Sequence, residues 1–220
     1  MTRARWIGLV GVALVVEAIL VRRGLVADPL PHLAGTAVWT TSRAAGVTAF
    51  AALALDVMFG LCASTGILDR WIPRAASIDV HRWLSGVALA LVATHALLLL
   101  GDPTLHFDAL DVLVPGLAPY RPAAVAVGVL AFHVALVVHA SFGWRKRIGV
   151  RAWRTLHVAS FAVFGAAVAH GLLAGSDGDR VGIRAVYASA GAIVLALTAT
   201  RLVQKRASSS VRARLAPIRQ

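Results

Sequence analysis

The sequence predicts an all-α integral membrane protein, built as a six-transmembrane-helix bundle with its N- and C-termini both cytoplasmic. Three observations predict this fold. Hydrophobic residues make up 59% of the 220 residues and charged residues only 15%, and the mean hydropathy is +0.77, a composition typical of membrane proteins. The apolar residues gather in six long segments. The basic residues cluster between those segments.

Each of the six segments has about the 20 residues that a helix needs to cross a bilayer. In order they cover residues 6–26, 44–66, 79–100, 122–142, 155–174 and 183–203. The first begins like a signal peptide, with Arg3 and Arg5 before an apolar run. Glu17 interrupts this run, Arg22 and Arg23 follow it, and no small-residue cleavage site is evident. We therefore interpret it as a transmembrane helix.

The basic residues predict the orientation of the chain. The formal net charge is +12, which in a soluble protein would suggest nucleic acid, but here topology explains it and no nucleic-acid partner is expected. With a cytoplasmic N-terminus, sixteen Lys and Arg residues lie inside and six outside. The outer six are Arg22, Arg23, Arg43, Arg121, Arg180 and Arg184. This excess on the inside predicts that segments 79–100 and 155–174 both run outward.

Two histidine pairs lie within these two parallel segments. His81 and His95 are fourteen residues apart, which on a helix brings the second imidazole to within about 40° of the first and roughly 21 Å further along. His157 and His170 are thirteen residues apart, a step that rotates by about 220° on a straight helix. His157 is expected near the start of its helix, where its direction need not follow the helical period.

Side-by-side helices would present these histidines as two facing pairs, His81 with His157 on the cytoplasmic side and His95 with His170 on the outer side. That is the geometry of two stacked hemes, each held by one imidazole from each helix. A single histidine in an apolar helix is more often a packing residue, but two pairs of similar rise favour ligation. Cys62 is the only cysteine, which excludes intrachain disulfides, iron–sulfur clusters and cysteine-based zinc sites.

Other polar residues within or beside the membrane are secondary candidates. Glu17 and Asp56 lie near mid-helix, where each carboxyl group is expected to be protonated, or paired with a neighbour such as a threonine of segment 44–66 or His133. Their functional reading is a proton path or part of a quinol pocket. His139, nearer the cytoplasm, could replace His81 or His157 as a ligand. Four arginines sit at membrane edges, where they could pair with heme propionates or anchor lipid phosphates: Arg43, Arg82, Arg121 and Arg154.

Several motifs resemble those of a known family. They are TSRAAG before the second segment, HRWLSG opening the third, PYRP before the fourth, RKRIGVRAWRTLH leading into the fifth and HGLLAGSDGD closing it. Together with the spacing within the two histidine pairs, they resemble the ferric reductase-like transmembrane domain, in its bacterial branch. That family includes ferric reductases, NADPH oxidases and the membrane subunit of bacterial methionine sulfoxide reductase systems.

The resemblance covers about residues 39–179, the expected heme-binding core. It implies that His81, His95, His157 and His170 ligate two b-type hemes. Residues 1–38 are then an added helix with its outer loop, 180–203 the sixth helix and 204–220 a basic cytoplasmic tail attracted to membrane lipid. The partly apolar loop 101–121 either folds over the outer heme as a lid or is an ordinary interfacial loop.

The expected function is that of a membrane cytochrome b, an oxidoreductase that moves electrons across the cytoplasmic membrane to an extracytoplasmic acceptor. Oxidase-type members of the family append a flavin- and nicotinamide-binding domain, which this sequence lacks, so the expected donor is a separate cytoplasmic flavin reductase or a membrane quinol. One alternative is a heme-bearing anchor for a dedicated extracytoplasmic reductase. Another is a metal or proton transporter using intramembrane histidines. The histidines lie at two depths and no inverted repeat is visible, and both observations argue against a transporter.

Overall fold

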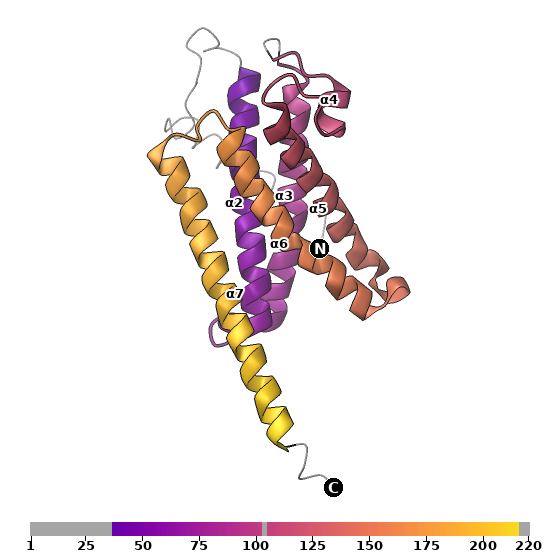
Figure 1. The fold of residues 1–220 in the computed structure, drawn as a ribbon, viewed down its shortest axis with the longest axis vertical. Coiled ribbons are helices and arrows are strands. Elements are labelled where there is room, and N and C mark those ends of the chain that lie inside the picture. Colours follow the sequence, from indigo (N-terminus) through magenta and orange to yellow (C-terminus); the bar gives the residue numbers. More distant parts are fainter. Residues whose placement is uncertain (1–36, 103–104, 216–220) are drawn as a thin grey trace.

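The computed structural model describes residues 37–102 and 105–215, with side chains described up to residue 210. This part of the chain is all helical, with no strand in it (Figure 1). The helices are α2 (Ala37–Thr65), α3 (Arg74–Leu99), α4 (Ala109–Leu113), α5 (Pro122–Ile148), α6 (Val150–Leu173) and α7 (Val181–Leu215).

Five of these helices are long and apolar enough to span a membrane. The shortest, α6, has 24 residues and is therefore about 36 Å long, more than the roughly 30 Å of a bilayer's hydrocarbon core. Their outward faces carry exposed apolar side chains such as Leu97, Val158 and Leu195, as expected of helices surrounded by lipid. Five of the six predicted segments are thus confirmed as helices. The segment 6–26, with Glu17, lies outside the described residues.

The long helices form two antiparallel hairpins, α2 with α3 and α5 with α6, and α7 lies along α2 (Figure 1). Figure 1 shows α3 and α6 running in the same direction, as predicted for segments 79–100 and 155–174. At the end where α5 turns into α6, this hairpin leans away from α2 and α3 (Figure 1).

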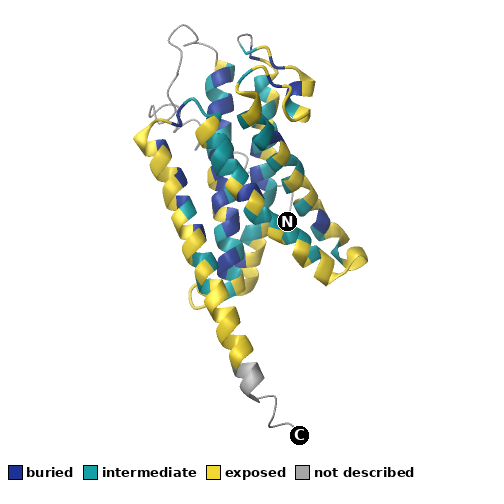
Figure 2. Cartoon of the chain, in the orientation of Figure 1, coloured by how far each residue is buried: buried dark blue, intermediate teal, exposed yellow. Residues whose placement is uncertain are grey.

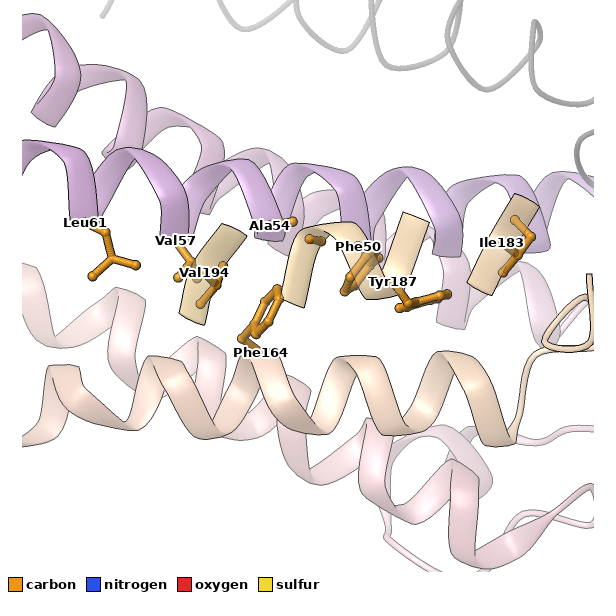
Figure 3. Packing of buried hydrophobic residues seen from close by; sticks show 9 residues of the cluster. Phe50, Ala54, Val57, Leu61, Phe164, Ile183, Tyr187 and Val194 are labelled. Carbon is orange, nitrogen blue, oxygen red and sulfur yellow. The ribbon is translucent and has the colours of Figure 1, made fainter. Parts of the chain in front are cut away.

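Helix α2 is the centre of the bundle. More than half of its most apolar stretch, 56%, is buried, against 22% or less for the other four spans, a contrast visible in Figure 2. One side packs on α6 and α7 through Phe50, Phe164 and Tyr187 (Figure 3). The side facing α3 uses small residues, including Ala49 and Ala52, which let two helix backbones approach closely.

The helix boundaries differ from prediction in two informative ways. Helix α7 continues to Leu215, so the basic residues after 203 extend the sixth predicted segment as helix. Helix α6 begins at Val150, two turns before His157, so the expectation that His157 sits at its helix start is wrong. The sharp turn between α5 and α6 is made at Gly149, whose φ of 83° suits a residue without Cβ.

Candidate functional site

The structure brings the four histidines of α3 and α6 together in two pairs. The imidazole centroids of His81 and His157 are 5.9 Å apart and those of His95 and His170 are 6.4 Å apart. Both contacts are edge-on, with interplanar angles of 88° and 72°. The axes of α3 and α6 are inclined to each other (Figure 1), and so the side of α6 that faces α3 changes along its length. Although thirteen residues rotate by about 220° on a straight helix, the imidazoles of His157 and His170 both lie beside their partners on α3.

These separations match two imidazoles on opposite sides of one metal ion. A metal–imidazole bond is about 2.0 Å long and the ring centre lies about 1.1 Å beyond the nitrogen, so trans imidazoles have centroids about 6 Å apart. Within the described residues, no group of three or more His, Cys, Asp or Glu side chains could hold a metal ion. Heme iron needs only two axial ligands from the protein, which is what each pair offers.

His95 is held in a cradle made by one turn of α2. Its Nδ1 lies 2.7 Å from the backbone oxygen of Ser42, and the Ser42 hydroxyl donates to the His95 carbonyl at 3.0 Å. One turn later stands Gly46, where a Cβ would lie 3.2 Å from the same ring. In a helix the side chain at position i+4 covers the carbonyl at position i. Glycine leaves that carbonyl open to the imidazole.

The same arrangement recurs at two more of the four histidines. His81 Nδ1 lies 2.9 Å from the backbone oxygen of Asp56, and a Cβ at Gly60 would lie 3.1 Å from its ring. On α5, the residues one turn apart are Ala124, whose oxygen is 2.9 Å from His170 Nδ1, and Gly128, whose Cβ would be 2.6 Å from that ring. Each cradle therefore pairs a carbonyl with a glycine four residues later.

The cradles fix which nitrogen of each ring is available. A carbonyl oxygen only accepts hydrogen bonds, so Nδ1 of His81, His95 and His170 must carry the proton. The neutral imidazole then presents an unprotonated Nε2, the nitrogen that a metal-ligating histidine offers when its other N–H is bonded to the protein. His157 is oriented differently, because its ring stacks on Trp153 at 5.1 Å between centroids.

A cavity opens around the His95–His170 pair. It lies between the hairpins and is lined mainly by apolar side chains of α2, α3, α5, α6 and α7. The loop 101–121 contributes Leu105, Phe107, Val112 and Tyr120 to this lining, as the lid interpretation of this loop expects. The cavity thus encloses the space that a planar ligand between His95 and His170 would occupy.

Arg43 stands at the polar end of this cavity. Its side chain is buried and forms an ion pair with Asp177, while its Nε and Nη1 have no hydrogen-bond partner among the described residues. The indole N–H of Trp39 and the hydroxyl of Ser176, both also in the lining, are buried without such a partner in the same part of the chain. Unmet buried donors are costly, and a carboxylate is the kind of group that pairs with a guanidinium.

The other predicted arginines lie elsewhere. The guanidinium of Arg82 stacks over the Phe142 ring at 4.5 Å and approaches Asp79 at 3.9 Å, with a half-exposed side chain. Arg121 donates to the backbone oxygen of Leu173 at 2.6 Å, where it satisfies a carbonyl at the end of α6. Arg154 is exposed. Of the four, Arg43 alone lines the cavity around His95 and His170.

The secondary polar residues are also placed. Asp56 is buried and its Oδ1 lies 2.8 Å from His81 Nδ1, so its partner is His81 rather than the threonine or His133 expected from the sequence. His139 is exposed, and its Nδ1 lies 2.9 Å from the Ser85 hydroxyl. His133 makes a ring contact with its neighbour Phe132 at 6.2 Å. The two described ring pairs contain neither His133 nor His139.

Sequence reasoning missed the glycine cradles, although a signal was present. Gly46 and Gly60 are fourteen residues apart on α2, the same spacing as His95 and His81 on α3. Antiparallel neighbours with equal spacing can meet at two levels, so this coincidence could have been noticed.

Comparison with protein-family models, with curated proteins and with solved structures finds no match to this chain.

Proposed function

We propose that this chain is a membrane cytochrome b that holds two hemes and passes electrons across the cytoplasmic membrane to an extracytoplasmic acceptor. The observation that carries the proposal is the pairing of His81 with His157 and of His95 with His170 between α3 and α6, at 5.9 and 6.4 Å. The motifs that flank these histidines within residues 39–179, which resemble those of the ferric reductase-like transmembrane domain, add to this support.

The residues fit heme in three further respects. Three of the four histidines have Nδ1 bonded to a backbone carbonyl, which leaves Nε2 for iron. The cavity around the His95 pair is lined mainly by apolar side chains, as a porphyrin ring requires. The buried donors of Arg43 and Trp39, which have no hydrogen-bond partner among the described residues, could hold a charged propionate.

Heme iron, when bound, would supply the one-electron chemistry. The protein's own part is ligation, orientation and a low-dielectric surround. His81 and His157 would ligate one iron, and His95 and His170 the other. The histidine positions on α3 are roughly 21 Å apart along its axis, so the two sites together extend over much of the membrane thickness.

The charge distribution supports the proposed direction of electron transfer. The end of the bundle with His81 carries the basic cluster Arg145, Lys146 and Arg147, and positive-inside bias places such clusters in the cytoplasm. Electrons therefore enter at the His81–His157 site from a cytoplasmic flavin reductase or a membrane quinol. They leave from the His95–His170 site.

Electron passage across vesicles tests this function. Proteoliposomes are loaded with NADPH, flavin and a flavin reductase, and ferricyanide is added outside. Vesicles whose chains have their C-terminal side facing the lumen should reduce ferricyanide, and the heme absorbance should pass through the reduced state. The orientation can be read by an impermeant thiol reagent on a Ser209→Cys variant, because Cys62 is buried and Ser209 is exposed.

The matched control is His95→Ala, which removes a ligand of the outward site only. Ferricyanide reduction should fall to the rate of protein-free vesicles, while the His81–His157 heme remains reducible. Rates for the unaltered chain no faster than those of protein-free vesicles, or equal to those of His95→Ala, would contradict the proposed electron path.

A further inference from the structure

The three cradled histidines differ in the side chain of the residue whose backbone carbonyl meets Nδ1. His95 lies against Ser42 and His170 against Ala124, so each Nδ1 meets a backbone carbonyl. His81 lies against Asp56, and there Nδ1 meets the backbone oxygen at 2.9 Å and also carboxylate Oδ1 at 2.8 Å. One site therefore has a carboxylate beside the Nδ1 of a histidine, whereas the groups that meet Nδ1 of His95 and His170 are uncharged.

Asp56 Oδ1 faces the His81 ring from a buried position. Its side chain is 10% exposed, and Oδ1 is buried without a hydrogen-bond partner among the described residues apart from its approach to His81. A carboxyl group at mid-helix in a membrane is costly unless it is matched to a polar partner. Inside such a low-dielectric site, a negative oxygen 2.8 Å from the ring acts on it with little screening.

We propose that Asp56 is a positioning residue that makes the His81 imidazole a stronger electron donor and thereby lowers the reduction potential of the His81–His157 heme below that of the His95–His170 heme. A carboxylate next to the outer ring nitrogen raises the basicity of a ligating histidine. A more basic axial ligand stabilises the oxidised iron and lowers its potential. Electron transfer from His81–His157 to His95–His170 is then downhill, which gives the bundle a direction of its own.

This inference rests on the proposed heme binding, but it can fail separately. Redox titration of the purified full-length protein, followed by heme absorbance, should resolve two midpoint potentials. His81→Ala should remove the component with the lower midpoint, and His95→Ala the component with the higher. Loss of the higher component in His81→Ala would overturn the inference while leaving heme binding intact.

Asp56→Asn tests the carboxylate directly. It removes the charge and nearly preserves size, so the lower midpoint should shift upward and the upper should stay in place. The low-spin electron paramagnetic resonance signal of the His81–His157 heme should shift with it, since the ligand field of His81 changes. Unchanged midpoints in Asp56→Asn would overturn the role of Asp56.

Two further variants separate this effect from a structural one. Asp56→Glu keeps a carboxylate and should therefore keep the low midpoint of the His81–His157 heme. If Asp56→Asn loses the His81–His157 heme, Asp56→Glu provides the test instead. A midpoint in Asp56→Glu as high as that of the His95–His170 heme overturns the inference. Ser42→Ala is the matched control at the His95 cradle. It removes the hydroxyl at His95 but no charge, and it should leave the lower midpoint unchanged.

Discussion

At the scale of single residues, three glycines decide how closely the imidazoles approach the neighbouring helices. Gly46, Gly60 and Gly128 each stand where a Cβ would lie 2.6 to 3.2 Å from a histidine ring. The nearest atoms belong to the ring itself, which a carbonyl holds through Nδ1. The ring cannot yield without breaking that hydrogen bond, so these positions control the geometry of the histidine pairs and not only helix packing.

Gly128→Ala should therefore disturb the His95–His170 site. The added Cβ would meet His170 Nδ1 at 2.6 Å and push the ring off the Ala124 oxygen. We expect the heme content per chain to fall from near two towards one, measured by the pyridine hemochrome assay.

Gly143→Ala on the same helix is the matched control, because nothing lies within 4 Å of a Cβ there. It should keep both hemes, and its thermal stability should be equal or higher, since alanine favours a helix over glycine by up to about 1 kcal/mol. Equal heme content in the two variants would mean that the Gly128 contact does not govern the site.

The cradles also mark the limit of what the sequence could predict at residue scale. The pairing of His81 with His157 and of His95 with His170 was expected from spacing and topology. The contact between Asp56 and His81 was not, because its register depends on how α2 and α3 pack. Hydropathy shows that both segments are buried in a membrane, but it does not specify which turn of one helix faces which turn of the other.

At the scale of elements, the buried pair of Arg43 and Asp177 ties α2 to the loop between α6 and α7. Removing one partner of a buried ion pair costs about 3–5 kcal/mol, so Arg43→Gln and Asp177→Asn should both lower the thermal unfolding temperature. Asp177 also pairs with Arg180 at 3.1 Å, so Asp177→Asn breaks two ion pairs and Arg43→Gln breaks one. A purely structural role for Arg43 therefore predicts at least as much heme loss from Asp177→Asn as from Arg43→Gln. A propionate partner predicts a larger loss from Arg43→Gln.

We expect Arg43→Gln to lose more heme than Asp177→Asn. Arg43→Gln should release heme from the His95–His170 site more readily than Asp177→Asn does, as measured by heme retained after dilution into apomyoglobin. Arg82→Gln is the control, because Arg82 is half exposed and stacks on Phe142, and it should retain both hemes. Equal heme loss from Arg43→Gln and Asp177→Asn would reduce Arg43 to a structural role.

The helices themselves were largely predictable, because apolar runs of membrane length leave few alternatives. Their ends were not. The start of α3 at Arg74 and the last turn of α5, with Arg145 to Arg147, are charged, so hydropathy ends the apolar segment while the hydrogen-bonded helix continues. Basic residues also suit the last turn of a helix, which is one reason α5 extends to Ile148.

At the scale of the whole molecule, each proposed heme joins the two hairpins, since one ligand comes from α3 and the other from α6. The hairpins pack closely within themselves, whereas α3 makes much less contact with α5 than with α2. Ligand binding to the folded state stabilises it. Two ligands shared between the hairpins would therefore contribute substantially to holding the bundle together, most of all at the leaning end of α5 and α6.

The measurement that tests the central claim most directly is the heme content and spectrum of the purified full-length chain beside its four histidine variants. The account predicts close to two hemes per chain, with a Soret band and a low-spin b-type spectrum on dithionite reduction. His95→Ala and His170→Ala should lose the same spectral component, and His81→Ala and His157→Ala the other. His139→Ala and His133→Ala should lose neither. A colourless protein from heme-replete cells that reconstitution does not restore, or loss of the inner component in His139→Ala but not His157→Ala, would contradict the account.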